Sequence, residues 1–166
     1  ARDTVKEKKP QKPGAFLDDP ISGKNKDSLV YDVRNKMVYI YNEGDITYQN
    51  SNLKADYMQI NMDNKMVYAY GKPDSLEGKP IVTKPEFSEG DASYTMDTIT
   101  YNIETEKARI KEVSTQDGEG YLLGARVKKM KDNTVNIAGG KFTTCDADHP
   151  HFYLAMTKAK MIPFED

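Results

Sequence analysis

The sequence is poor in several residue types. It has one cysteine, Cys145, and no tryptophan among its 166 residues. One cysteine cannot form a disulfide within the chain. In an exported protein a single thiol suggests a partner cysteine elsewhere, so Cys145 is either inert or bonded to a segment outside this sequence.

Long hydrophobic runs are also absent. No stretch approaches the ~18 apolar residues of a membrane helix, and the first residues lack the apolar core of a signal peptide. If the protein is exported, its signal was removed, and we expect the chain to be part of a longer protein. Hydrophobic residues make up 37% of the chain and charged residues 30%. We therefore expect the apolar residues to form one face of each strand rather than a large core.

The charge balance argues against one class of function. The formal net charge is −2, with 24 Lys and Arg against 26 Asp and Glu. A nucleic-acid-binding domain needs clustered Lys and Arg, so we expect no nucleic-acid partner.

Composition divides the chain into two parts. Residues 1–27 include the Lys- and Pro-rich run KEKKPQKPG and few residues that could be buried, so we expect a flexible N-terminal lead-in. From Ser28 onward Tyr, Val, Ile, Thr and Met alternate with polar residues. Period-two alternation is typical of half-buried strands, because successive side chains point to opposite faces. We expect a single β domain over residues 28–166.

The strand pattern recurs along the chain. Residues 31–41 read YDVRNKMVYIY, and residues 60–70 read INMDNKMVYAY. A third copy, YNIETEKARIK, begins at Tyr101, and a weaker one, KDNTVNIAG, begins at Lys131. Each copy predicts a strand, a short polar turn and a second strand, because Asn, Asp and Lys suit tight turns. Such a succession indicates a repeat protein, with an ordinary β-sandwich of similar hairpins as the alternative.

The apolar positions change phase ahead of the second copy. Leu53 and Ala55 have one parity, whereas Met58, Ile60 and Met62 have the other. A change of phase within an extended segment requires a bulge or a corner. Corners of this kind allow a long ribbon to fold into two facing sheets.

Two further segments carry expectations about strands. Residues 72–90 contain three prolines and two glycines, so we expect a longer connection there, with a short edge strand at residues 80–82. The segment HFYLAM, residues 151–156, is expected to form the last strand.

Several of these residues match a known family. The segment LKADY (residues 53–57), followed by NKMVYAYG (64–71), resembles the repeat of the OstA-like superfamily. This superfamily comprises the β-jellyrolls of the lipopolysaccharide-transport proteins LptA, LptC and the N-terminal domain of LptD. The resemblance covers residues 28–161. FTTCD (142–146) and DHPHFY (148–153) are similar to the segment that closes the periplasmic domain of LptD, and they favour that member.

The resemblance implies a fold and a function. The fold would be an all-β, V-shaped, open-edged jellyroll of two sheets. The domain would be periplasmic, associated with the outer membrane, non-enzymatic and without cofactor or metal. It would shield the lipid A acyl chains of lipopolysaccharide in an apolar groove. Its partners would be lipopolysaccharide, other OstA-like jellyrolls joined by edge-strand addition, and an outer-membrane β-barrel in the same chain.

The repeats predict which side chains face that groove. They are the apolar residues of one parity in each copy: Tyr31, Val33, Val38, Ile40, Met58, Ile60, Met62, Val67, Ile99, Tyr101, Ile103, Ala108, Ile110, Val135 and Ile137. The same residues could instead fill a closed core. A structural or adhesive β-repeat protein of the surface or periplasm is therefore the alternative function, and a carbohydrate-active enzyme is a third.

Other chemistry is less well supported by the sequence. Cys145, Asp146, Asp148, His149 and His151 are of ligand type, but zinc sites favour four Cys and His in spaced pairs, so we expect no metal. The tyrosine pairs Tyr39/Tyr41 and Tyr68/Tyr70 either stack on sugar rings or form the outer face of a sheet.

Overall fold

The computed structural model describes residues 22–71, 73–76, 79–90, 92–117, 119–146 and 150–162. These residues form strands and no helix, which confirms the predicted all-β fold. It follows that this part of the chain holds no helix long and apolar enough to cross a bilayer. The strands are β1 (Ser22–Lys24), β2 (Ser28–Asp32), β3 (Met37–Tyr48), β4 (Ser51–Asn61), β5 (Met66–Tyr70), β6 (Pro73–Leu76), β7 (Lys79–Val82), β8 (Glu86–Glu89), β9 (Ala92–Thr95), β10 (Thr98–Asn102), β11 (Lys107–Asp117), β12 (Gly120–Lys129), β13 (Val135–Thr143) and β14 (Leu154–Met161).

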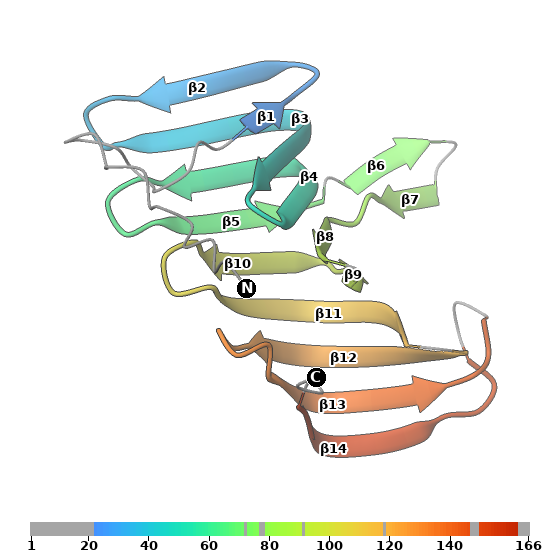
Figure 1. Ribbon diagram of the computed structural model, residues 1–166. Coiled ribbons are helices and arrows are strands. Elements are labelled where there is room, and N and C mark those ends of the chain that lie inside the picture. Colours follow the sequence, from blue (N-terminus) through green and yellow to red (C-terminus); the bar gives the residue numbers. More distant parts are fainter. Residues whose placement is uncertain are drawn as a thin grey trace, which may run out of the picture.

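Twelve of the strands form one continuous antiparallel sheet. Its main order is β1-β3-β4-β5-β10-β11-β12-β13-β14, with β2 beside β3, β8 against β4 and β9, and β9 against β11. Figure 1 shows the strands stacked from β2 at one end to β14 at the other. The strands β6 and β7 form a separate hairpin. Most neighbours in the sheet are also neighbours in the sequence, as expected for a chain of hairpins.

The long strands bend, and the bends divide the sheet into two layers. Between β3 and β4 the register shifts from the pair Tyr41/Tyr57 to the pair Gly44/Ala55, so two residues of β3 oppose Asp56 alone. The extra residues are Asn42 and Glu43, which both have positive φ. This bulge confirms the corner that the change of phase around Ala55 predicts.

The two layers face each other across the core. The first layer consists of β2, β5, β10 and the adjoining halves of β3, β4 and β11–β14. The second consists of β1, β8, β9 and the remaining halves of those long strands. Phe87 of β8 contacts Tyr101 of β10, with ring centroids 5.6 Å apart. Buried apolar residues of both layers form one cluster.

Packing at the corner requires glycine at one position above all. Gly124 of β12 lies opposite Gly140 of β13, next to the bend. A Cβ on Gly124 would lie 2.7 Å from Val127 Cγ2 and 3.1 Å from the side chains of Ile137 and Val113. The absent side chain therefore lets the two layers close on each other at this bend.

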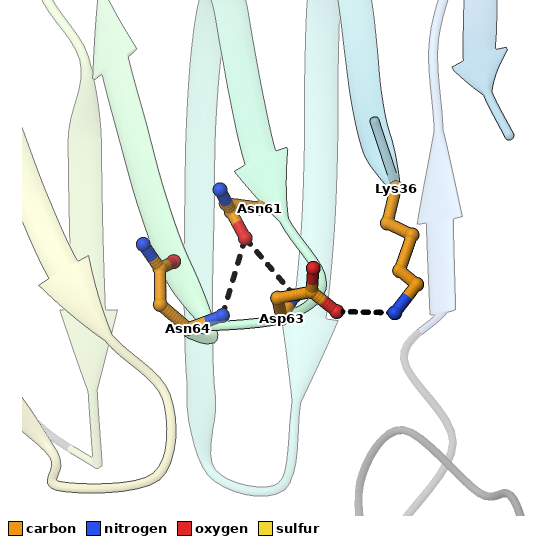
Figure 2. A network of polar contacts seen from close by, with 4 residues as sticks. All are labelled: Lys36, Asn61, Asp63 and Asn64. Atoms are coloured by element: carbon orange, nitrogen blue, oxygen red, sulfur yellow. Dashed lines mark hydrogen bonds and ion pairs between the residues drawn. The ribbon is translucent and has the colours of Figure 1, made fainter. Parts of the chain in front are cut away.

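The repeated turns stack beside one another along the first layer. In Figure 2 the Asn61 side-chain oxygen accepts hydrogen bonds from the backbone N–H groups of Asp63 and Asn64, at 2.9 and 3.1 Å. Lys36 of the preceding turn lies 2.8 Å from the Asp63 carboxylate. Each turn ends on a residue with positive φ: Lys36, Lys65, Glu106 and Asn133. The repeat in the sequence is thus a ladder of similar turns, each held by a local side-chain acceptor.

Two expectations about the strands need correction or extension. The last strand, β14, runs from Leu154 to Met161 rather than over residues 151–156. The Thr143 hydroxyl donates to the Phe152 carbonyl at 2.7 Å, which satisfies that carbonyl before the ladder begins. The strand expected at residues 80–82 lies within β7, whereas β8 was not predicted. β1 falls inside the expected lead-in, of which residues 1–21 lie outside the described residues.

Candidate functional site

The space between the two layers is lined by the apolar faces of the repeats. Alternate residues of each strand point inward, as the pleat requires. Most of the residues predicted to face a groove are buried there: Ile40, Met58, Ile60, Val67, Ile99, Tyr101, Ile103, Ala108, Ile110 and Ile137. Val38 and Val135 are partly buried against them, and Met62 is half-buried.

Tyr31 and Val33 occupy a different environment. Their exposed fractions are 49% and 71%. Tyr31 lies opposite the inward-facing Val38, so it belongs to the same face of the sheet. It is exposed because β2 pairs only with β3 in the part of the chain that the structure describes. The interior face therefore continues to an open edge at β2.

β14, at the opposite end of the sheet, also exposes interior positions at an open edge. β14 pairs only with β13 among the described strands. Met161 lies opposite Val135 on the interior face and is 38% exposed. Apolar interior positions thus reach solvent at both ends of the sheet, which is the arrangement expected of open edges.

The interior is filled at one end and hollow at the other. Met58 and Ile99, between β4 and β10, are fully buried. A cavity of about 220 Å³ lies between the later strands. Ile110, Val135 and Ile137 of the first layer line it, and Met161 carries it to the β14 edge.

The far wall of this cavity was not predicted. Phe87, Val113 and Leu122 of the second layer line it. Val113 and Leu122 lie on the other side of the bends of β11 and β12, where the parity of inward positions reverses, so extending the alternation of the first layer places them outside. Phe87 lies on β8, which was not predicted. The parity of Leu53 and Ala55 was the one signal in the sequence that pointed to the second layer.

A charged pair joins the two layers at the border of the cavity. Lys129, at the end of β12, faces inward and lines the cavity. Its Nζ lies 2.6 Å from Glu89 Oε2 of β8, and the two side chains are 6% and 25% exposed. Nζ has this ion-pair partner but no well-aligned hydrogen bond. The pair links the two layers at their free margins, which are the ends of the strands farthest from the bends. Lys129 and Val127 are two residues apart on β12, so the alternation in the sequence places a charged side chain on the apolar face.

Tyr101 lies next to this pair. Burial raises the pKa of its phenol to about 12, and the carboxylates of Glu89 and Glu106 contribute to the increase. The phenol is therefore neutral at any physiological pH and serves as part of the apolar wall.

Replacing Tyr101 with phenylalanine is expected to reduce the loss of stability that the protein undergoes at alkaline pH. The folded pKa of about 12 exceeds the unfolded value of about 10, so stabilisation that is complete below pH ~10 is lost as the pH rises towards 12. Allowing for solvent screening, we expect the loss to be about 1–2 kcal/mol smaller in the variant. Urea unfolding at pH 9 and 11.5 measures it, with Tyr68→Phe as the exposed control. Equal losses of stability between these two pH values in the wild type and in both variants would contradict the raised pKa of Tyr101.

The thiol of Cys145 lies at the end of β13. It is half-buried, and its Sγ is 3.6 Å from His151 Nδ1. Among the described residues no three His, Cys, Asp or Glu side chains are placed to hold a metal ion. Asp148 and His149 lie outside those residues. A disulfide from Cys145 to another segment stays a prediction.

Comparison with known proteins adds one finding. No protein-family model and no curated protein sequence matches the chain. A solved structure does match: that of LptH from Pseudomonas aeruginosa, described as the LptA-homologous periplasmic component of the lipopolysaccharide transport device. The superposition has a TM-score of 0.53 and covers 87% of this chain and 95% of LptH, at 12% sequence identity.

This chain has the LptA-type jellyroll fold. The match extends over nearly all of LptH, so the complete two-layer arrangement is shared rather than a few hairpins. The bends, the open edges and the cavity described above are those of this chain's LptA-type jellyroll. The jellyroll fold that the resemblance implied is therefore confirmed.

Proposed function

We propose that this domain holds lipopolysaccharide in the periplasm, with the acyl chains of lipid A between its two layers. The observation that carries the proposal is the apolar cavity that reaches the β14 edge of an LptA-type jellyroll. LptH, which has the same fold, is a component of a lipopolysaccharide transport device. The domain would act as a carrier and not as an enzyme.

The chemistry of the interior suits a cargo that must bind and move on. Apolar burial contributes about 25 cal/mol per Å² and has no preferred direction, so a chain can slide without breaking specific bonds. Met156, packed against the cluster, and Met161 can adapt to an irregular cargo. The cavity of about 220 Å³ is smaller than the ~300–1,000 Å³ of ligand pockets in general. Binding would therefore require the layers to separate at their free margins.

The open edges support a proposal about partners. β2 and β14 each leave one side without a neighbouring strand in the described structure. Strand addition at these edges would join the domain to further jellyrolls and extend the interior from one to the next. The segment around Cys145 favours the periplasmic domain of LptD, placed next to the outer membrane and disulfide-bonded through Cys145. Amphipathic strands encoded after residue 166 would support that assignment.

A photo-crosslinking residue in the interior tests the function. Placed at Leu122 or Ile110, which line the cavity, it is expected to capture lipopolysaccharide on irradiation. Leu123, the next residue of β12, points to the opposite face and is the matched control. Failure to capture lipid at both interior positions, in a variant that keeps its thermal stability, would favour a closed structural or adhesive protein. The filled half around Met58 and Ile99 is the observation that supports that second candidate.

A further inference from the structure

The outer face of the first layer carries a cluster of positive charge. Its residues point away from the interior on β11, β12 and β14, and they are Arg109, Lys111, Arg126, Lys128, Lys158 and Lys160. The register brings them together: Arg109 lies opposite Lys128, and Lys111 lies opposite Arg126. The net charge of −2 conceals this cluster, because acidic residues lie elsewhere.

The six cations surround a hollow of about 780 Å³. On β13, between β12 and β14, the outward positions are occupied by the short side chains of Asn136 and Ala138. Longer Lys and Arg side chains rise on both sides of them, so β13 forms a recessed floor. Towards the N-terminal half the lining continues with Thr100 and Tyr68. The volume lies within the ~300–1,000 Å³ range of sites that enclose small molecules.

These charges form no close ion pair within the described structure, although six other cations do. Lys160 contributes, after the hydrogen bonds from Thr134, to lowering the pKa of the Asp132 carboxyl. Like charges directly opposite on neighbouring strands destabilise a sheet, and this layer has two such pairs side by side. A bound anion would remove that cost. The repulsion therefore points to an anionic ligand as the occupant.

We propose that this hollow binds a saccharide that carries phosphate groups. Arg and Lys are the side chains that recognise phosphate, Arg through paired N–H donors and Lys as a point charge. Tyr68 is 39% exposed at the border of the hollow and lies beside Tyr70, with ring centroids 5.8 Å apart. These tyrosines, with Thr100 and Asn136, offer ring faces and hydrogen-bonding groups for sugar. A flat bilayer would touch the tips of the cations but would not reach the floor at Ala138. The site is on the opposite face from the lipid cavity and does not depend on it.

Calorimetric titration with glucose 1,6-bisphosphate tests the site. The double variant Arg126→Gln, Lys128→Gln removes two cations of the hollow, and Lys24→Gln, Lys54→Gln removes the same charge from the second layer, away from the hollow. We expect binding at least about tenfold weaker in the first variant and changed less than about twofold in the second. The first variant should melt no lower than the wild type, because it loses like-charge repulsion.

Three further arms identify the ligand. Glucose should not bind, and inorganic phosphate at equal ionic strength should bind at least about tenfold more weakly than the bisphosphate. Equal affinity for inorganic phosphate would overturn the saccharide part of the proposal. Vesicles of phosphatidylglycerol that bind the wild type, without competition from the bisphosphate, would instead assign the face to a membrane surface. Absence of bisphosphate binding, or equal loss in both double variants, would overturn the site itself.

Discussion

Replacing Glu89 with glutamine is expected to lower the free energy of unfolding by about 2–3 kcal/mol. The substitution leaves the ammonium of Lys129, which is 6% exposed, between the two layers without its carboxylate. Breaking a buried ion pair by removing one partner costs about 3–5 kcal/mol when both groups are fully buried. Glu89 is 25% exposed, so the environment of the pair is partly hydrated and we expect a smaller loss.

The complementary substitutions make this prediction specific to the pair. Lys129→Met alone should cost about 1 kcal/mol, because the remaining carboxylate of Glu89 can reach water. The double variant Glu89→Gln, Lys129→Met removes both charges and should lie within about 1 kcal/mol of the wild type. Urea unfolding at pH 7 measures all three. Lys128→Met, a neighbour on the outer face, is the control and should change the stability by less than about 0.5 kcal/mol.

Additive effects in this cycle would show that the two side chains do not interact across the layers. A double variant that is more stable than the sum of the two single effects predicts would show that the pair holds the free margins of the two layers together. Opening of those margins is the movement that acyl-chain entry requires under the proposed function. The Glu89→Gln, Lys129→Met variant should then capture lipopolysaccharide at Leu122 at least as efficiently as the wild type.

Two aspartates on the interior face of β2 are expected to weaken the proposed end-to-end assembly at least about tenfold. Leu29 and Tyr31 are 56% and 49% exposed and lie opposite Ile40 and Val38. A strand added at this edge would bury them against the interior of the next domain. Buried carboxylates without partners prevent such contacts, and inward charges on edge strands block pairing in natural sheets.

Sedimentation of the protein over a range of concentrations measures this effect. The wild type should form larger species at high concentration, and Leu29→Asp, Tyr31→Asp should need at least about tenfold more protein to do so. Ser28→Asp, Val30→Asp changes the other face of the same strand and is the matched control. Assembly that persists unchanged in the interior-face variant would show that β2 is not the joining edge.

Local patterns in the sequence predicted much of the first layer. The NKMVY copies and their Asn and Asp acceptors specify hairpins through contacts within a few residues, such as those of Asn61 with Asp63 and Asn64. The reversed parity of Leu53 and Ala55 predicted a bend where the bulge opposite Asp56 occurs. These features were readable because their causes lie close together in the chain.

The second layer was less readable. β8 follows Pro85 and has four residues, so its alternation is too short to recognise. Its ladder with β4 joins Leu53 to Phe87, residues far apart in the sequence. The start of β14 was likewise misjudged, because the Thr143–Phe152 hydrogen bond uses the Phe152 carbonyl before the strand begins. The candidate site was only partly predicted for the same reason. Ile110 and Ile137 were predicted to line it, whereas Phe87, Val113 and Leu122 were not.

The sequence alone determined that this chain folds into successive hairpins with one apolar face, because alternation and turn residues act over a few positions. Only the tertiary structure decided what those faces enclose. The bends bring two layers together, leave a cavity in one half and set Glu89 against Lys129. The same register collects six dispersed Lys and Arg residues around one hollow. Such groupings depend on which strands become neighbours, and pairing between distant strands leaves no local trace in the chain.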